Sequence, residues 1–291
     1  MGEDISDQSF QPPKSVRGMK KLDRTAFKQI VKIPAIKVPV KKISLLNKHL
    51  KKSLCKFAKI RPIAELSDDD PEKDEFRLFL LKPQKYINAN SFDKREHQLL
   101  EQVGIKLPSD LIWADIELGY DNWNVSEIFR AVIPGDSDSV SGFTTIGHIA
   151  HLNLREDVLD YKYLIGEVLL DKIPSVKTVV NKVNIIDNTF RNFEMELLAG
   201  EKDFFATVRE NKCIYQFDFD KVYWNSRLGR EHEYIINKLT SGDFVFDVFA
   251  GVGPFAIPAA KKGCQENNEN QYRFFSEFCN RNFTRSQKTT D

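Results

Sequence analysis

The stretch "FDVFAGVGPFAIPAAKKGCQENNENQ", residues 246–271, decides how the C-terminal part of this sequence folds. The apolar residues around Asp247 predict a buried strand over 244–249, and those after Gly253 predict a helix. Gly251 and Gly253 lie between them, where the lack of a Cβ lets the backbone turn and approach a ligand closely. The N–H groups at the start of the following helix add hydrogen-bond donors. The pattern predicts a cofactor-binding turn of an α/β sheet.

The acidic residue of this turn indicates the chemistry of the ligand. A dinucleotide turn has a third glycine, but Ala256 occupies that spacing, and Asp247 lies at the end of the expected strand. The pattern Asp-x-Phe-x-Gly-x-Gly suits a cationic cofactor with an amino-acid end, S-adenosylmethionine, better than a diphosphate. The alternative is an ordinary glycine turn of an α/β sheet.

The charge of the chain is unevenly distributed. Residues 1–60 contain 15 Lys and Arg and 4 Asp and Glu, a net charge of +11, so the remainder carries −10. Such a basic region is suited to a nucleic-acid backbone, and the alternative is a solvated lysine face. No apolar run reaches the roughly 18 residues that span a bilayer, so no membrane segment is expected.

Cysteine and histidine spacing predicts no metal site. The four cysteines form no CxxC pair, and we expect them to be reduced thiols. His148 and His151 lie three residues apart in "GHIAH", but no carboxylate or thiol cluster accompanies them, which favours partly buried polar positions. Gly2 and Ser6 match the bare N-myristoylation pattern, and the acidic N-terminus is neither a signal peptide nor an obvious presequence.

Changes in composition predict five consecutive segments. They are a disordered leader (1–18), a basic α/β domain (19–88), a mixed α+β middle domain (89–215), a third unit that contains the glycine turn (216–264) and a polar tail (265–291).

Four motifs in this order resemble one known family. "TTIGHIAHLNLR", "NKVNIIDNTFRNFEMELLAGE", "VYWNSRLGREH" and "FDVFAGVGPFAIP" are similar to the tRNA (guanine-37) N1-methyltransferases of eukaryotes and archaea, over roughly residues 18 to 264. The resemblance implies α/β and α+β domains: a small basic domain that contacts tRNA, a middle domain that helps to place the anticodon loop, and an incomplete Rossmann-type class I methyltransferase domain. It also implies a monomer that transfers a methyl group from S-adenosylmethionine to N1 of guanine 37 in cytoplasm, nucleus or mitochondrion.

The resemblance assigns roles to particular residues. Arg227 would stabilise the guanine O6, and the alternative is a structural salt bridge. His232 would contact the cofactor, and the alternative is an exposed helix histidine. The methionine end of the cofactor would lie against Asp247, Gly251, Gly253 and Pro254.

The sequence departs from the family after Gly263. Residues 265–291 contain no Val, Ile, Leu, Ala or Gly, and we expect no strand there to deliver Glu266 or Glu269 to the cofactor ribose. The chain therefore resembles a methyltransferase cut after its first cofactor motif, folded well to about residue 215 and poorly beyond. Two functions stay open: tRNA methylation, and a catalytically inactive product that still binds tRNA. A small-molecule methyltransferase would leave 19–215 without a purpose.

Overall fold

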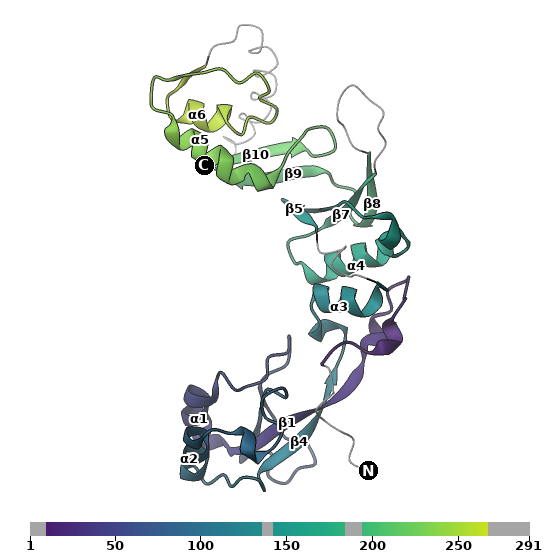
Figure 1. Ribbon diagram of the computed structural model, residues 1–291, viewed down its shortest axis with the longest axis vertical. Coiled ribbons are helices and arrows are strands. Elements are labelled where there is room, and N and C mark those ends of the chain that lie inside the picture. Colours follow the sequence, from purple (N-terminus) through teal and green to yellow (C-terminus); the bar gives the residue numbers. More distant parts are fainter. Residues whose placement is uncertain (1–9, 136–141, 184–193, 267–291) are drawn as a thin grey trace. The chain divides into compact units, whose positions relative to one another are not determined.

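The computed structural model describes residues 10–135, 142–183 and 194–266, in two compact units (Figure 1). Unit 1 covers 1–136 and unit 2 covers 137–291. Gly2, Glu269, and most of the "NKVNIIDNTFRNF" segment lie outside the described residues. Within the described ranges, no helix has the length and apolar character needed to cross a membrane.

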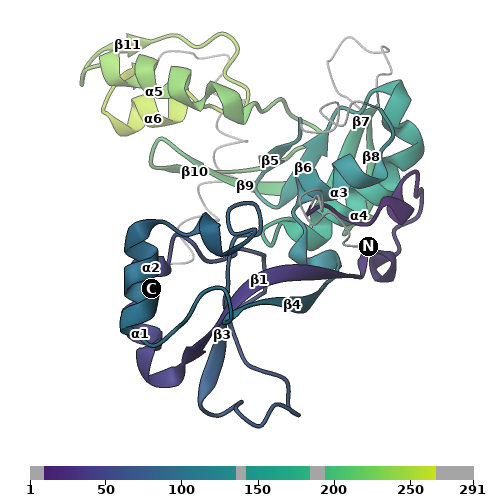
Figure 2. The same ribbon diagram turned by 60° about the horizontal axis from the view of Figure 1, so that its bottom comes forward.

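Unit 1 is built on an antiparallel sheet with the strand order β2-β3-β1-β4, of which Figure 2 labels β3, β1 and β4. Its main core joins apolar side chains of the sheet, such as Phe79, to those of the helices, such as Leu46 and Leu100. The strands are β1 (Gln29–Pro39), β2 (Ile63–Ala64), β3 (Phe76–Leu80) and β4 (Leu111–Leu118), and the α-helices are α1 (Ile43–Leu50), α2 (Lys94–Gln102) and α3 (Val125–Val132). Short 3-10 helices occupy Lys14–Val16, Arg24–Phe27, Val40–Lys42, Ala89–Ser91 and Tyr120–Asn122.

The basic domain does not end near residue 88 as expected. β4 pairs with β1 from Gln29↔Leu118 to Ile36↔Leu111, so it forms an edge strand of the same sheet. Leu100 of α2 lies in the core that the sheet covers. Long-range strand pairing, which composition does not reveal, places 89–118 in unit 1.

Part of the expected disordered leader is folded. Val16 is fully buried, and the N–H of Gly18 donates to the Val132 carbonyl at 2.7 Å. The Gln29 side chain donates to the carbonyl of Gln11 at 2.7 Å. The prediction of disorder is therefore wrong for residues 10–18.

Unit 2 contains a second sheet, with the order β5-β6-β7-β8, in which β6 and β7 are parallel and the other pairs antiparallel. The helix α4 packs against β7 and β8 (Figure 1). A Cβ on Gly166 of α4 would lie 2.7 Å from the Leu198 Cβ, so glycine permits this close approach. The elements are β5 (Thr144–Ile146), β6 (Ile149–Leu152), a 3-10 helix (Glu156–Tyr161), α4 (Lys162–Lys172), β7 (Thr178–Val183) and β8 (Glu194–Gly200).

A hairpin of β9 (Phe205–Glu210) and β10 (Cys213–Asp218) continues unit 2. Its two-residue turn has positive φ at Asn211 (48°) and Lys212 (61°), as in the primed turns that match strand twist. Tyr215 and Phe217 share one core with Ile146 and Val180 of the second sheet. The expected boundary at 215/216 thus falls inside β10.

The segment after the hairpin differs from expectation in its strands. The helix α5 (Gly229–Lys238) follows a 3-10 helix at Ser226–Leu228, and the helix predicted after Gly253 forms as α6 (Ala256–Lys261). Only two residues of the predicted strand 244–249 form one, β11 (Phe244–Val245), and it pairs in parallel with β12 (Gln265–Glu266). The expectation of no strand after Gly263 is wrong, because backbone pairing does not require aliphatic side chains. Phe244, Phe246 and Phe249 are exposed, Phe249 to 94%.

Candidate functional site

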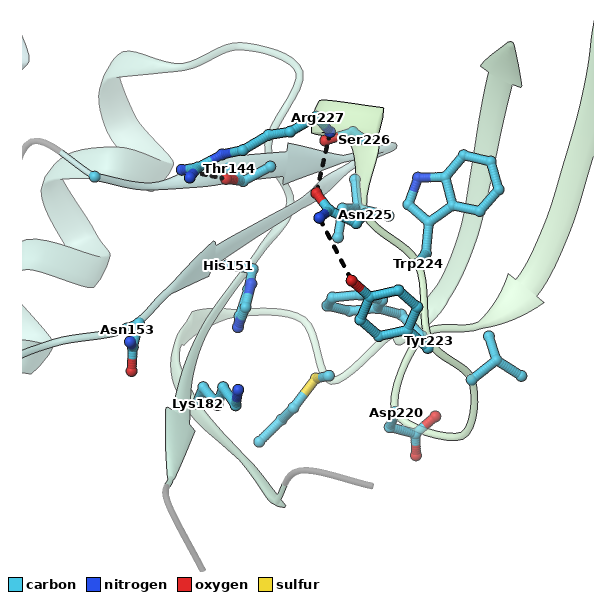
Figure 3. A pocket seen from close by; sticks show the side chains of 15 residues that line it. Thr144, His151, Asn153, Lys182, Asp220, Tyr223, Trp224, Asn225, Ser226 and Arg227 are labelled. Atoms are coloured by element: carbon cyan, nitrogen blue, oxygen red, sulfur yellow. Dashed lines mark hydrogen bonds between the residues drawn. The ribbon is translucent and has the colours of Figure 1, made fainter. Parts of the chain in front are cut away.

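A pocket of about 270 Å³ lies within unit 2 (Figure 3). One wall is the β5–β8 sheet, which contributes His151, Asn153 and Lys182. The other wall is the loop after β10, which contributes Tyr223 and Arg227. The volume is near the lower end of the range for small-ligand sites, roughly 300 Å³ upward. The pocket therefore offers room for a small ligand or one group of a larger one.

Buried aromatic packing holds the loop wall. The Trp224 ring lies 5.1 Å from that of Tyr215 and 5.2 Å from that of Phe217, between ring centroids. The side-chain oxygen of Asn225 accepts a hydrogen bond from the Arg227 backbone N–H at 3.1 Å. This bond caps the start of the 3-10 helix. Tyr223, next to the buried Trp224, is 68% exposed. The loop thus presents an accessible aromatic ring beside a cation.

Arg227, expected to be catalytic, lies in this pocket. Its Nη2 is 3.5 Å from Thr144 Oγ1, and its side chain forms no ion pair with another residue in the described ranges. A guanidinium remains charged at any physiological pH. The geometry thus gives the pocket a positive charge. Among the described residues, Arg227 does not form the structural salt bridge that was the alternative to a catalytic role.

His151 provides a neutral polar group on the sheet wall. Burial, and next the charge of Lys182, lower the pKa of His151 below its usual value. Phe219 packs against the imidazole with 5.5 Å between centroids and an interplanar angle of 74°. At neutral pH this ring therefore offers one hydrogen-bond donor and one acceptor nitrogen.

His232, expected to contact the cofactor, is buried rather than exposed on its helix. Its Nδ1 lies 2.5 Å from Glu210 Oε1, with the side chains 7% and 13% exposed. The ring also packs against Phe255, with 4.8 Å between centroids, and lies 6.4 Å from Trp224. His232 thus connects α5 with β9, with the residue before α6 and with the loop wall of the pocket.

The glycine turn has a carboxylate that suits a cationic ligand. Gly251 and Gly253 have φ of 54° and 87°, the left-handed region that favours glycine. Asp247 Oδ1 accepts from the Phe249 N–H at 3.2 Å, whereas Oδ2 is buried and has no hydrogen-bond partner among the described residues. A buried carboxylate oxygen requires a donor. The turn, in which Pro254 is half-buried, therefore fits the ammonium group of an amino-acid-bearing cofactor.

The structure brings together only some of the predicted site residues. Arg227 lines the pocket, whereas the other five predicted residues do not: His232, Asp247, Gly251, Gly253 and Pro254. The core that contains Trp224 also contains Val252 of the glycine turn, so buried side chains connect the two regions. Within the described ranges, no group of three His, Cys, Asp or Glu side chains is arranged to hold a metal ion.

Sequence reasoning missed the sheet wall and the exposed ring of Tyr223. A signal was present for Tyr223, which lies in the "VYWNSRL" motif. Asn153 and Lys182 also lie in two of the quoted motifs, but their shared wall depends on strand pairing between β6 and β7, which no single motif reveals.

Comparisons with known proteins agree with this architecture. Residues 125–203 match the family model described as the TYW2 N-terminal domain, and residues 206–280 match the TRM5/TYW2 methyltransferase domain. A crystal structure of Trm5b from Pyrococcus abyssi has a TM-score of 0.56 at 24% identity, covering 86% of this chain and 68% of that one. A structure of aTrm5 in complex with tRNALeu has a TM-score of 0.55 at 23% identity, covering 85% and 71%. The two family models and the shared fold together place residues 125–280 in the TRM5/TYW2 class.

Relatives named tRNA (guanine(37)-N(1))-methyltransferase narrow the class. The Homo sapiens protein is 50% identical over 255 residues, which are 88% of this chain and 49% of the relative. The Drosophila melanogaster protein is 42% identical over 279 residues, 94% of this chain and 59% of the relative. The chain belongs to the tRNA (guanine(37)-N1)-methyltransferase family, as its motifs predicted. It spans about half the length of the curated relatives that it matches.

Proposed function

We propose that this chain acts in the methylation of tRNA at N1 of guanine 37, with S-adenosylmethionine as the methyl donor. The observation that carries this proposal is the 50% identity over 255 residues to a relative named for that activity. The identity extends over most of this chain, so it covers both walls of the pocket as well as the basic unit.

The pocket residues suit an extruded purine. The N1 of guanine carries a proton at neutral pH, so its methylation requires removal of that proton while negative charge develops on O6. The Arg227 guanidinium would stabilise that charge, and the exposed ring of Tyr223 would stack on a base taken out of the anticodon loop.

The glycine turn would hold the amino-acid end of the methyl donor. When bound, S-adenosylmethionine supplies an electrophilic methyl group on a sulfonium. Asp247 Oδ2 would accept from its ammonium group, while Gly251, Gly253 and Pro254 would leave room for the backbone to approach it. His232 would support this arrangement from beneath, through its contact with Phe255.

Unit 1 supplies the charge for a tRNA backbone. Five exposed lysines lie on and beside α1, namely Lys41, Lys42, Lys48, Lys51 and Lys52. Each phosphate that such a cluster neutralises releases counterions, so binding would weaken steeply with salt. Binding of the tRNA backbone by unit 1 and methyl transfer in the pocket would therefore use different residues of this chain and can be measured separately.

The test is transfer of labelled methyl from S-adenosylmethionine to an unmodified tRNA with guanine at position 37, beside an adenine-37 tRNA. We expect guanine-dependent incorporation that Arg227→Ala reduces and that the matched variant Arg209→Ala, exposed on β9, leaves unchanged. tRNA binding without any incorporation would refute the enzymatic function and support the binding function. Loss of both would refute the proposal.

We also propose that the protein is a monomer that works in the cytoplasm and nucleus, with the mitochondrial matrix for forms that carry a presequence. Light scattering at several protein concentrations tests the first point, and imaging of the tagged protein tests the second.

A further inference from the structure

The sheet wall of the pocket carries several polar side chains beside the apolar Ile146 and Met195. His151 pairs with Thr144 on one neighbouring strand and with Val180 on the other. Because side chains alternate along a strand, Lys182, two positions after Val180, lies on the same side as His151. Asn153 directly follows β6 and lines the same pocket. Figure 3 shows these side chains on the wall opposite Tyr223. The pocket therefore presents polar groups opposite an aromatic ring.

His151 has an unexplained polar atom at this wall. Its Nε2 is buried and has no hydrogen-bond partner among the described residues. Most buried polar side-chain atoms in proteins have a partner, so an exception indicates a missing group. The contact with Phe219 fixes the ring rather than satisfying the nitrogen. Because His151 is one of the residues that line the pocket, the absent partner is expected on the pocket side.

His148, three residues earlier in the same motif, has hydrogen-bond partners for its Nε2 atom. Its Nε2 lies 3.2 Å from the Asp203 carbonyl and 3.4 Å from Asp203 Oδ2. It is not among the residues that line the pocket. The two histidines of "GHIAH" therefore have different roles, and His148 is a matched control for His151.

We propose that His151 binds the edge of an RNA base in this pocket through Nε2, with Asn153 as a second polar contact on the same wall. The inference rests on the proposed function, because that function makes RNA the ligand. Unstacked bases of RNA loops are recognised by hydrogen bonds to their edges and by stacking on aromatic rings. The sheet wall supplies the first, and Tyr223 supplies the second. Burial keeps the pKa of His151 low, so the imidazole can both donate and accept at neutral pH.

A titration of the full chain with a labelled, unmodified anticodon stem-loop RNA tests this role. His151→Phe keeps a ring against Phe219 and removes both nitrogens, so affinity should fall about fivefold, the loss of one net hydrogen bond. His151→Gln places an amide nitrogen near the same point and should restore most of the affinity. His148→Gln should bind as the unaltered protein does.

Two outcomes would overturn the inference. Equal affinity of His151→Phe and the unaltered protein would show that Nε2 makes no contact with RNA. In the unaltered protein with ¹⁵N-labelled histidine, the His151 Nε2 resonance should shift on addition of RNA and that of His148 should not. An unchanged His151 signal with RNA bound would refute the contact, even if a variant fails to fold. Failure of the unaltered protein to bind RNA would instead refute the proposed function.

Discussion

The contact between His232 and Glu210 should act as a strong local link in unit 2, and its energy can be measured by a double-mutant cycle. Both side chains are nearly buried, and Nδ1 lies 2.5 Å from Oε1. A Cβ at Gly229, the first residue of α5, would lie 3.0 Å from Glu210 Oε2. The carboxylate therefore contacts both the start of α5 and its first turn.

The magnitude follows from burial and charge. A hydrogen bond to a charged group contributes about 1.5–3 kcal/mol. A carboxylate at a helix N-terminus adds about 0.3–1 kcal/mol. We therefore expect Glu210→Ala to lower the free energy of opening of the hairpin and α5 by about 2–4 kcal/mol. The coupling energy with His232→Ala should be about 2 kcal/mol, because contacting residues do not behave additively.

Native-state hydrogen exchange is the assay, because it reports opening of β9, β10 and α5 without requiring the whole chain to unfold in one step. Glu233→Gln, on the exposed side of α5, is the matched control and should change protection by less than about 0.5 kcal/mol. A coupling energy below about 0.5 kcal/mol would contradict the link. His232 would then act at the ligand and not in the fold.

Three further predictions concern other parts of unit 2. Gly166→Ala should destabilise unit 2 by about 1 kcal/mol in urea unfolding, since overpacking against Leu198 costs about 1–3 kcal/mol and the gain in helix propensity is about 1 kcal/mol. Because the pKa of His151 is lower in the folded state, His151 is protonated at a higher pH in the unfolded chain than in the folded protein. The stability that neutral His151 contributes is therefore present above about pH 6.5 and is lost as the pH falls through the folded pKa. The melting temperature of unit 2 should therefore fall less in His151→Gln than in the unaltered protein on acidification. Asp247→Asn should weaken S-adenosylmethionine binding at least about tenfold by calorimetry without lowering stability, because it removes a buried, unpartnered carboxylate oxygen.

Each of these has a result that would contradict it. If Gly166→Ala were as stable as the unaltered protein, β8 would be able to move away from α4 without cost, which contradicts the first prediction. Equal acid sensitivity of His151→Gln would show that other groups dominate the pH dependence. Unchanged cofactor affinity in Asp247→Asn would remove the carboxylate from the binding site.

Elements with local periodicity could be predicted from the sequence, and pairings between distant segments could not. The helix after the glycine turn was predicted from the apolar residues that follow Gly253, which are a local signal, and it forms as α6. Strand 244–249 was predicted too long, because a strand extends only as far as its partner, here the polar residues Gln265 and Glu266. Hydrophobicity alone does not indicate such a partner.

The candidate site shows the same limit. The glycine turn and Arg227 lie in contiguous motifs, so a single segment of sequence carries their signal. The pocket is assembled from β6, β7 and the loop after β10, which are brought together by strand register and by the burial of Trp224. That convergence made His151 a residue of the pocket wall, although its spacing from His148 had indicated only a partly buried polar position.

The short parallel pair β11 and β12 has a consequence for the behaviour of the protein in solution. Residues 244–249 present Phe244, Phe246 and Phe249 to solvent beside a two-residue strand pair. Exposed apolar side chains near unpaired backbone promote association between molecules. Association between molecules should therefore depend on protein concentration and ionic strength well below the unfolding temperature. Aggregation of this protein would then begin from the folded state, at one identifiable segment of its surface.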